Sequence, residues 1–90
     1  MNKQELVKRI ARDAEVTQRQ AAVMIDSMVN IIMDTVADGE KVLIQGFGCF
    51  ESRTRAARNS RNPATGGIMV IPEAVVPVFK AGQEFKDKLD

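Results

Sequence analysis

The sequence contains no histidine, tryptophan or tyrosine, and it has a single cysteine, Cys49, among its 90 residues. Histidine is the commonest general base and the commonest metal ligand, so its absence argues against acid–base catalysis and against a metal centre. One cysteine can form neither an internal disulfide nor a thiolate metal cage, which favours a reducing, intracellular compartment. We therefore expect no enzyme activity, no small-molecule substrate, no cofactor and no metal.

Long hydrophobic runs are also missing. No uninterrupted apolar segment approaches the roughly 20 residues that span a bilayer, and the opening Met-Asn-Lys-Gln-Glu lacks the features of a signal peptide. Yet 44% of the residues are apolar. A chain this short with so much aliphatic content more often shares its core with a second copy than folds alone. The composition therefore predicts a homodimer that is not a membrane protein.

Charge is unevenly distributed, although the net formal charge is only +1. Residues 1–40 have five Lys or Arg against seven acids, whereas residues 41–90 have eight against five. The segment from Ser52 to Pro72 has no acid, and its charged residues are Arg53, Arg55, Arg58 and Arg61. An ordinary solvated loop would more often mix Lys with Glu, and arginine suits forked contacts with phosphate. The segment thus indicates an anionic partner that one element contacts.

The first half of the chain has helical periodicity. Asn2 and Glu5 have the spacing of a capping pair ahead of an apolar stripe that runs to Ala14. Thr17-Gln18-Arg19-Gln20 is a capping box that opens a second helix, and Asp38-Gly39 ends it. The apolar arc of this second helix is wider than a two-helix hairpin can cover, so we expect it to pack against a second surface.

The second half changes to strand and turn patterns. Val42-Leu43-Ile44 predicts a short strand, followed by a tight turn and a second strand through Phe50. The turn signal Asn62–Gly67 leads into a third strand, which begins with Ile68–Ile71 and continues to Phe79. Pro77 confines the third strand to an edge. After it, Phe85 and Leu89 mark a short terminal helix, so the predicted order is α-α-β-β-β-α.

One hairpin, from about Arg53 to Ile71, is unusually long. Ten residues separate Arg53 from Pro63, which at roughly 3.3 Å per residue is about 33 Å of strand. A 9.9 kDa domain is scarcely wider, so the tip must project. Because an isolated two-stranded ribbon is marginal in water, a projecting one rich in arginine is best explained as an element that orders on a partner. A bulge or a strong twist near Ala56-Ala57 would bring all four arginines toward one surface.

With these motifs, the sequence resembles the bacterial HU/integration-host-factor family of histone-like DNA-binding proteins, and HU more closely. The resemblance covers most of the chain. It is carried by Gly46-Phe47-Gly48-x-Phe50-Glu51, Arg61-Asn62-Pro63-x-Thr65-Gly66 and Val76-Pro77-x-Phe79-Lys80-Ala81-Gly82. The tip motif combined with the upstream Gly-Phe-Gly-x-Phe is highly specific.

The resemblance implies an α+β fold. It would be an intertwined dimer with a helical body, a short antiparallel sheet and a long projecting β-ribbon arm per chain. Residues 1–90 would form a single DNA-binding domain, with a helical dimerisation part at 1–40, the sheet and arm at 41–82 and a C-terminal helix at 83–90. The arm itself would span about 53–71. The residues implied in the dimer core are Ile25, Met28, Val29, Ile32, Phe47, Phe50 and Phe79.

The resemblance also implies a function, which is to bind double-stranded DNA with little sequence preference, bend it and compact or stabilise it in the cytoplasmic nucleoid. The arms would lie in the minor groove, and Pro63 would wedge between base pairs and favour bent, nicked or junction DNA. The alternative interpretation of Pro63 is that it only forms the turn and does not enter the DNA. The residues implied in DNA binding are Lys3, Arg53, Arg55, Arg58, Arg61, Asn62, Pro63, Lys80 and Lys86.

Some positions depart from the family pattern. The segment Gly67–Val70 is apolar where relatives usually have charged residues, Gln18 and Gln83 occupy places where Lys is common, and the pI of 7.9 is low. We therefore expect binding that is less purely electrostatic than is usual. We interpret Cys49 as a small buried hydrophobe rather than a redox group, because no thiolate activator is near it in the sequence.

Two other functions remain open. The first is a site-specific DNA-bending factor of the integration-host-factor type, with the same fold. The second is a module whose ribbon adds a strand to a protein partner. Salt-dependent binding to random DNA would exclude the second, and competition between random and chosen sequences would test the first.

Overall fold

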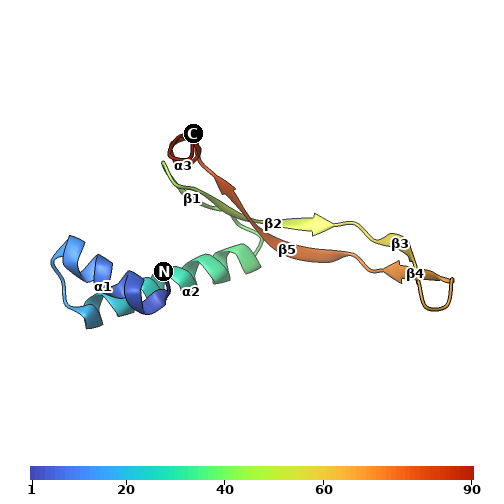
Figure 1. The fold of residues 1–90 in the computed structure, drawn as a ribbon, viewed down its shortest axis with the longest axis horizontal. Helices are drawn as coiled ribbons and strands as arrows, with labels where there is room; N and C mark the ends of the chain where they lie inside the picture. Colours follow the sequence, from blue (N-terminus) through green and yellow to red (C-terminus); the bar gives the residue numbers. More distant parts are fainter. The chain divides into compact units, whose positions relative to one another are not determined.

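The computed structural model describes residues 1–90 and contains helices and antiparallel strands, which confirms the predicted α+β class. Its elements are α1 (Lys3–Ala14), α2 (Gln18–Ala37), β1 (Val42–Ile44), β2 (Gly48–Arg55), β3 (Arg58–Arg61), β4 (Ile68–Ile71), β5 (Ala74–Ala81) and α3 (Gln83–Asp87) (Figure 1). The chain divides into two compact units, Met1–Asp34 and Thr35–Asp90.

Both predicted capping motifs are present at the starts of α1 and α2. The backbone N–H of Glu5 donates to Asn2 Oδ1 at 2.9 Å. Thr17 and Gln20 cap each other: the N–H of Gln20 donates to Thr17 Oγ1, and the N–H of Thr17 donates to Gln20 Oε1, each at 3.0 Å. These bonds satisfy backbone donors that a helix start leaves unpaired. The starts of these two helices therefore follow from local sequence.

Helix α2 buries only part of its apolar surface within one chain. Ala21 and Ile25 are buried, and Ile32 is half-buried. Exposed apolar side chains flank them: Met24, Met28, Val29, Ile31 and Met33. Met28 is 50% exposed and Ile31 is 60% exposed. Of the residues expected in a dimer core, Ile25 is thus already covered within the chain, whereas Met28 and Val29 are open to a further surface.

By length and average composition, α2 also meets the requirements of a membrane-spanning helix, with a mean hydropathy of 1.2 over 18 residues. Its apolar residues do not form an uninterrupted run, because Arg19, Asp26 and Asp34 lie among them. At 100° per residue, these three charges fall on one side of the helix. A polar row of this kind is typical of a helix that packs its other side against protein.

In the second unit, three strands form an antiparallel sheet in the order β1-β2-β5. The β2–β5 register runs from Gly48↔Ala81 to Arg55↔Ala74. Gly48 lets two backbones approach closely, since a Cβ at this position would lie 2.5 Å from the carbonyl oxygen of Lys80. Strand β5 pairs only with β2, as expected for an edge strand that contains Pro77.

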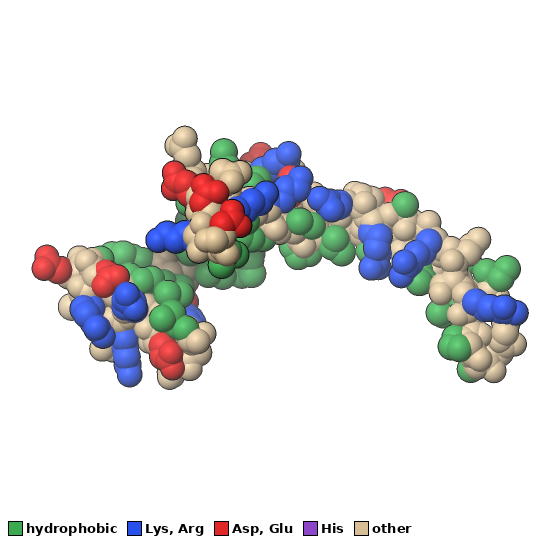
Figure 2. Space-filling view, turned by 45° about the horizontal axis from the view of Figure 1, so that its top comes forward, with side chains coloured by type: hydrophobic (Ala, Val, Ile, Leu, Met, Phe, Trp, Pro, Cys, Tyr) green, Lys and Arg blue, Asp and Glu red, His purple; other side chains and the backbone are tan.

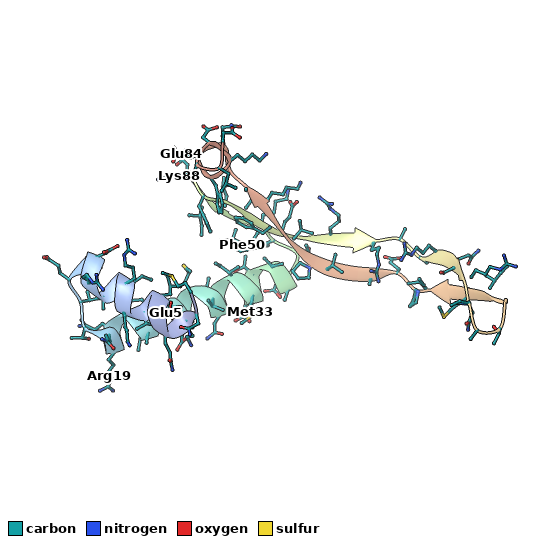
Figure 3. The ribbon with its side chains drawn as sticks, viewed as in Figure 1. Glu5, Arg19, Met33, Phe50, Glu84 and Lys88 are labelled. Carbon is teal, nitrogen blue, oxygen red and sulfur yellow. The ribbon has the colours of Figure 1, made fainter.

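Four phenylalanine rings pack together between the sheet and α3. The centroids of Phe50 and Phe79 are 4.8 Å apart, and Phe47 stacks on Phe85 with centroids 5.6 Å apart. Phe47 also lies 5.1 Å from Phe79, which joins the two pairs. Figure 3 labels Phe50 on β2. Phe47 and Phe79 remain exposed in the single chain, so the aromatic residues expected in the dimer core are gathered but incompletely covered.

The long hairpin is present as two ladders rather than one, so five strands replace the three that the sequence predicts. Strands β3 and β4 pair as a separate sheet from Arg58↔Ile71 to Arg61↔Ile68. The pairs on either side of the gap, Arg55↔Ala74 and Arg58↔Ile71, keep one register. Of the bulge and the strong twist that the sequence left as alternatives near Ala56-Ala57, the bulge is therefore absent, because the same number of residues, two, is unpaired on each side of the gap. Pro72 contributes to the gap, since it has no N–H to donate.

The C-terminal helix is shorter than expected. Helix α3 ends at Asp87 instead of residue 90. Leu89, which the spacing placed on the helix with Phe85, lies beyond it and is exposed. The last turn of a short helix is stable only where tertiary contacts support it. Phe85 packs against Phe47 and Phe79, whereas Leu89 is exposed, so the helix ends before Leu89.

Candidate nucleic-acid interface

The pleat of β2 separates two kinds of side chain. Residues at alternate positions share a face of a strand, together with the residues directly opposite. Phe50 shares a face with Phe79, which is its partner on β5. Glu51, Arg53 and Arg55 lie on the other face, which is therefore the charged side of the β2–β5 ladder.

All four predicted arm arginines are exposed, and each faces an aliphatic residue across the ladder. The opposed pairs are Arg53↔Val76, Arg55↔Ala74, Arg58↔Ile71 and Arg61↔Ile68. None of the ion pairs in the structure includes one of these arginines. Figure 2 shows Lys and Arg side chains at intervals along the ribbon, with hydrophobic side chains between them. Four guanidinium groups are thus free to bind an external anion.

The unbroken register assigns these arginines to different faces. By alternation, Arg53, Arg55 and Arg61 share one face of the ribbon, and Arg58 lies on the other. With no bulge to change the alternation, only the right-handed twist of the strands can turn Arg58 toward the same partner. The sequence allowed either a bulge or a strong twist near Ala56-Ala57, and only the twist is compatible with this register.

The hairpin tip is closed by its own hydrogen bonds. The N–H of Asn62 donates to the carbonyl of Gly67 at 2.7 Å, and the N–H of Gly66 donates to the carbonyl of Asn62 at 2.8 Å. The Asn62 side chain accepts from the N–H of Ala64 at 2.9 Å, and Thr65 Oγ1 accepts from the N–H of Gly67 at 3.3 Å. Pro63 is exposed within this closed turn.

A buried carboxylate lies at the base of the ribbon. Glu51 is only 7% exposed, and it is the one buried charged residue of the chain. Its Oε1 is 2.8 Å from Lys80 Nζ, and its Oε2 is 3.3 Å from Lys41 Nζ. Hydrogen bonds from Lys80 and then Lys41 hold the pKa of the Glu51 carboxyl below its ordinary value, and burial opposes this effect only in part.

The sequence predicted Lys80 as a binding residue but missed Glu51, its ion-pair partner, and Lys41, which pairs with the same carboxylate. Lys41 directly precedes β1, whose first residue, Val42, pairs with Phe50 beside Glu51. The available signal was therefore a lysine one position before a strand that pairs with Phe50-Glu51. Without the register, that signal could not be distinguished from an ordinary surface lysine.

Two further predicted positions belong to different units. Lys3 in α1 forms an ion pair with Asp26 in α2, with 2.5 Å between Nζ and Oδ1. Lys86 is exposed on α3. The structure therefore brings the arm residues and Lys80 together along one ribbon and leaves Lys3 and Lys86 outside it.

Cys49 is half-buried rather than buried as expected. It lies on β2 opposite Lys80, and its Sγ is 3.8 Å from the carbonyl oxygen of Phe50. Cys49 is paired with Leu43 on the edge strand β1. Because Leu43 is itself 73% exposed, it shields Cys49 little from solvent.

Comparison with known proteins gives consistent matches over the whole chain. Residues 1–90 match the family model described as "Bacterial DNA-binding protein". The chain is 44% identical to DNA-binding protein HU of Clostridium pasteurianum over 90 residues, which cover 100% of this chain and 99% of that protein. It is 46% identical to DNA-binding protein HU of Staphylococcus aureus (strain COL) over 87 residues, 97% of each chain.

The fold matches solved structures as well. The Anabaena HU–DNA cocrystal structure superposes with a TM-score of 0.92 at 46% identity, covering 99% of this chain and 97% of that one. HU from Thermotoga maritima gives a TM-score of 0.71 at 30% identity, and the match covers 100% of both chains. The likeness therefore extends over helices, sheet and ribbon together.

Proposed function

This chain belongs to the bacterial DNA-binding protein family, and on that premise we propose that it is a histone-like architectural protein that binds double-stranded DNA, bends it and compacts it. One observation carries the proposal: the ribbon presents four exposed arginines with no ion-pair partner. Unpaired guanidinium groups in a row match the repeating phosphates of a duplex. The Anabaena relative of nearly the same fold is a complex of HU with DNA.

The arm supports binding with little sequence preference. Contacts to phosphate position a protein on DNA without reading its sequence, and the minor groove offers only a degenerate pattern of donors and acceptors. The tip has one amide side chain, Asn62, and its Oδ1 already accepts a hydrogen bond within the turn. The named relatives are likewise HU proteins. A site-specific bending factor is therefore the weaker alternative.

Pro63 is assigned as the wedge that kinks the duplex. Apolar side chains that enter a minor-groove step unstack it partly, and the bent DNA then contacts more protein surface. Pro63 is exposed on a turn that four hydrogen bonds close, which gives the ring a rigid support. DNA that is nicked or forms a junction is already bent or unstacked, so it should bind more tightly.

We propose that the protein is a homodimer whose interface contains the exposed apolar side of α2 and the phenylalanine cluster. Met28, Ile31 and Phe47 are all at least two-fifths exposed in the single chain. Exposed apolar surface of this extent marks an interface, and a second copy is its simplest cover. In this assembly residues 1–90 act as one DNA-binding domain, with residues 1–40 as the dimerisation part.

From DNA binding we also infer the roles of the lysines outside the arm and the location of the protein. Lys3, Lys80 and Lys86 would contact phosphate outside the arm, and binding would place the protein on the nucleoid in the cytoplasm. A structural role rather than catalysis agrees with a family that is described by DNA binding alone. The arm, residues 53–71, contains no residue of a type that commonly acts as a general acid or base.

A gel-shift experiment on linear, nicked and four-way-junction DNA at two salt concentrations tests the proposal. We expect binding of random sequence, a preference for nicked and junction DNA, and a steep loss of affinity with salt. Binding that does not respond to salt, or no binding, would contradict it. In that case a protein partner that extends the ribbon by one strand becomes the better explanation.

A further inference from the structure

The buried Glu51 is the feature of this ribbon that the arginine row does not explain. A carboxylate in the central strand must be desolvated, and its ion pairs with Lys80 and Lys41 serve largely to offset that cost. An apolar residue at this position would stabilise a sheet at least as well. We propose that Lys41, Glu51 and Lys80 form a phosphate-binding position at the base of the arm, with Glu51 as the residue that positions both ammonium groups. This inference rests on the proposed DNA-binding function.

Two of the three residues lie on adjacent strands of one sheet, and the third directly precedes the strand on the other side of β2. Glu51 lies on the central strand β2, Lys80 lies on β5, and Lys41 immediately precedes β1. The two lysines use different oxygens of the carboxylate: Lys80 approaches Oε1 and Lys41 approaches Oε2. The carboxylate therefore acts as a spacer that holds the two Nζ atoms on either side of it.

The arrangement places the negative charge inside and the positive charges outside. The side chain of Glu51 is 9% exposed, whereas those of Lys80 and Lys41 are 57% and 70% exposed. An ammonium group has three donors, so each lysine retains donors for an external acceptor. A phosphate that approaches this face meets two cations before it meets the carboxylate, and the cluster has a net charge of +1.

The position is continuous with the arginine row. Glu51 and Arg53 are two residues apart and share a face of β2, as does Arg55. The cations on this face thus run from Lys41 and Lys80 at the base of the ribbon into the arm. A DNA backbone that follows the arm reaches Lys41, which the sequence did not assign to binding.

Positioning explains why a carboxylate is useful here. A lysine has a flexible four-carbon stem, and ordering it on a phosphate loses conformational freedom. Glu51 restricts both stems before DNA arrives. The expected gain in affinity is roughly twofold to tenfold for each lysine that no longer has to be ordered on binding.

The decisive variants are Glu51→Gln and its control Glu73→Gln. Both remove one negative charge, and Glu73 is exposed beside the arm with no ion pair. Simple electrostatics predicts tighter DNA binding for both variants. Positioning predicts the opposite sign for Glu51→Gln alone, which should bind a random duplex more weakly than the parent does. Tighter or equal binding by Glu51→Gln would overturn the proposal.

A second pair of variants does not depend on the stability of the Glu51→Gln protein. Lys41→Gln should lower the slope of log affinity against log salt by about 1.8 per dimer, if each chain loses one phosphate contact. The control Lys8→Gln in α1 removes the same charge and should leave the slope unchanged. An unchanged slope for Lys41→Gln would also overturn the proposal. If the parent protein itself shows no salt-dependent binding, the proposed function fails instead, so the two failures are distinguishable.

Discussion

Arg61 lies directly opposite Ile68 in the β3–β4 ladder, so a guanidinium group and an exposed aliphatic side chain are neighbours across the arm. Arg58 lies opposite Ile71, a half-buried aliphatic residue, at the other end of the ladder. Strand β3 thus contributes the charge and β4 the apolar surface. An aliphatic neighbour offers no acceptor that competes with phosphate. This explains how a chain with a net charge of +1 presents uncompensated cations in one place.

The arginines should carry the salt dependence of DNA binding. Changing Arg55, Arg58 or Arg61 to Ala removes two phosphate contacts per dimer, so the log–log salt slope should shrink by about 1.8 for each variant. Affinity should fall about equally for different sequences. Fluorescence anisotropy over a series of salt concentrations measures both quantities, with Arg12→Ala in α1 as the control. Unchanged slopes for all three variants would place the DNA elsewhere on the surface.

Pro63→Ala should separate binding from bending. The arginine contacts position the protein independently of the wedge, so binding to linear DNA should largely survive. The ring that fills the opened base step is lost, so bending should not survive. Fluorescence transfer between the ends of a short labelled duplex reports the bend. A variant that bends the duplex as much as the parent does would reduce Pro63 to a turn residue.

The hydrogen bonds of the tip should matter for the wedge as well. Thr65→Val removes the Oγ1 acceptor of the Gly67 N–H, whereas Thr65→Ser keeps it. We expect faster amide exchange at Gly67 and less bending for the valine variant, with both properties near the parent values for serine. The loss of one such bond is worth about 1 kcal/mol. Equal exchange rates in the two variants would show that the backbone bonds close the turn unaided.

The dimer should be obligate, and its stability should depend on concentration. Each tenfold increase in protein concentration should stabilise the folded dimer by about 1.4 kcal/mol. Met28→Lys places a charge on the apolar side of α2 and should destabilise the dimer by roughly 2–4 kcal/mol. Val23→Lys is the control, because Val23 is exposed beside the polar row and its replacement should change little. Sedimentation that shows a folded monomer at micromolar concentration contradicts this prediction.

Glu51 should stabilise the folded protein near neutral pH and lose this contribution in acid. Its folded-state pKa is lowered by Lys80 and Lys41, so the contribution is complete above the ordinary glutamate pKa of 4.5. It is lost as the pH falls through the lower folded-state value. Chemical denaturation of the parent and Glu51→Gln should therefore differ by a constant amount near neutral pH, and the two curves should converge in acid. A difference that persists unchanged to low pH would show that the carboxylate charge is not responsible.

Local sequence determined the starts of α1 and α2 and the turns. Asn2, Thr17 and Gln20 form capping bonds to residues three positions away, and such bonds need no tertiary contact. Gly39 and Gly66 adopt left-handed backbone with φ of 86° and 73°, which residue type alone makes favourable. The arm arginines could be predicted for the same reason, because four exposed charges without acids between them are visible in the chain itself.

Only the tertiary structure decided which strands pair and how much of the apolar side of α2 is buried. The β2–β5 and β3–β4 registers show that the ribbon has no bulge and place Glu51 beside Lys80 and Lys41. Neither follows from alternation, because the period of a strand says which residues share a face but not which strand lies next to it. Likewise, the width of the apolar arc on α2 is a property of its sequence. How much of that arc one chain leaves exposed depends on packing, which brings together residues far apart in the sequence.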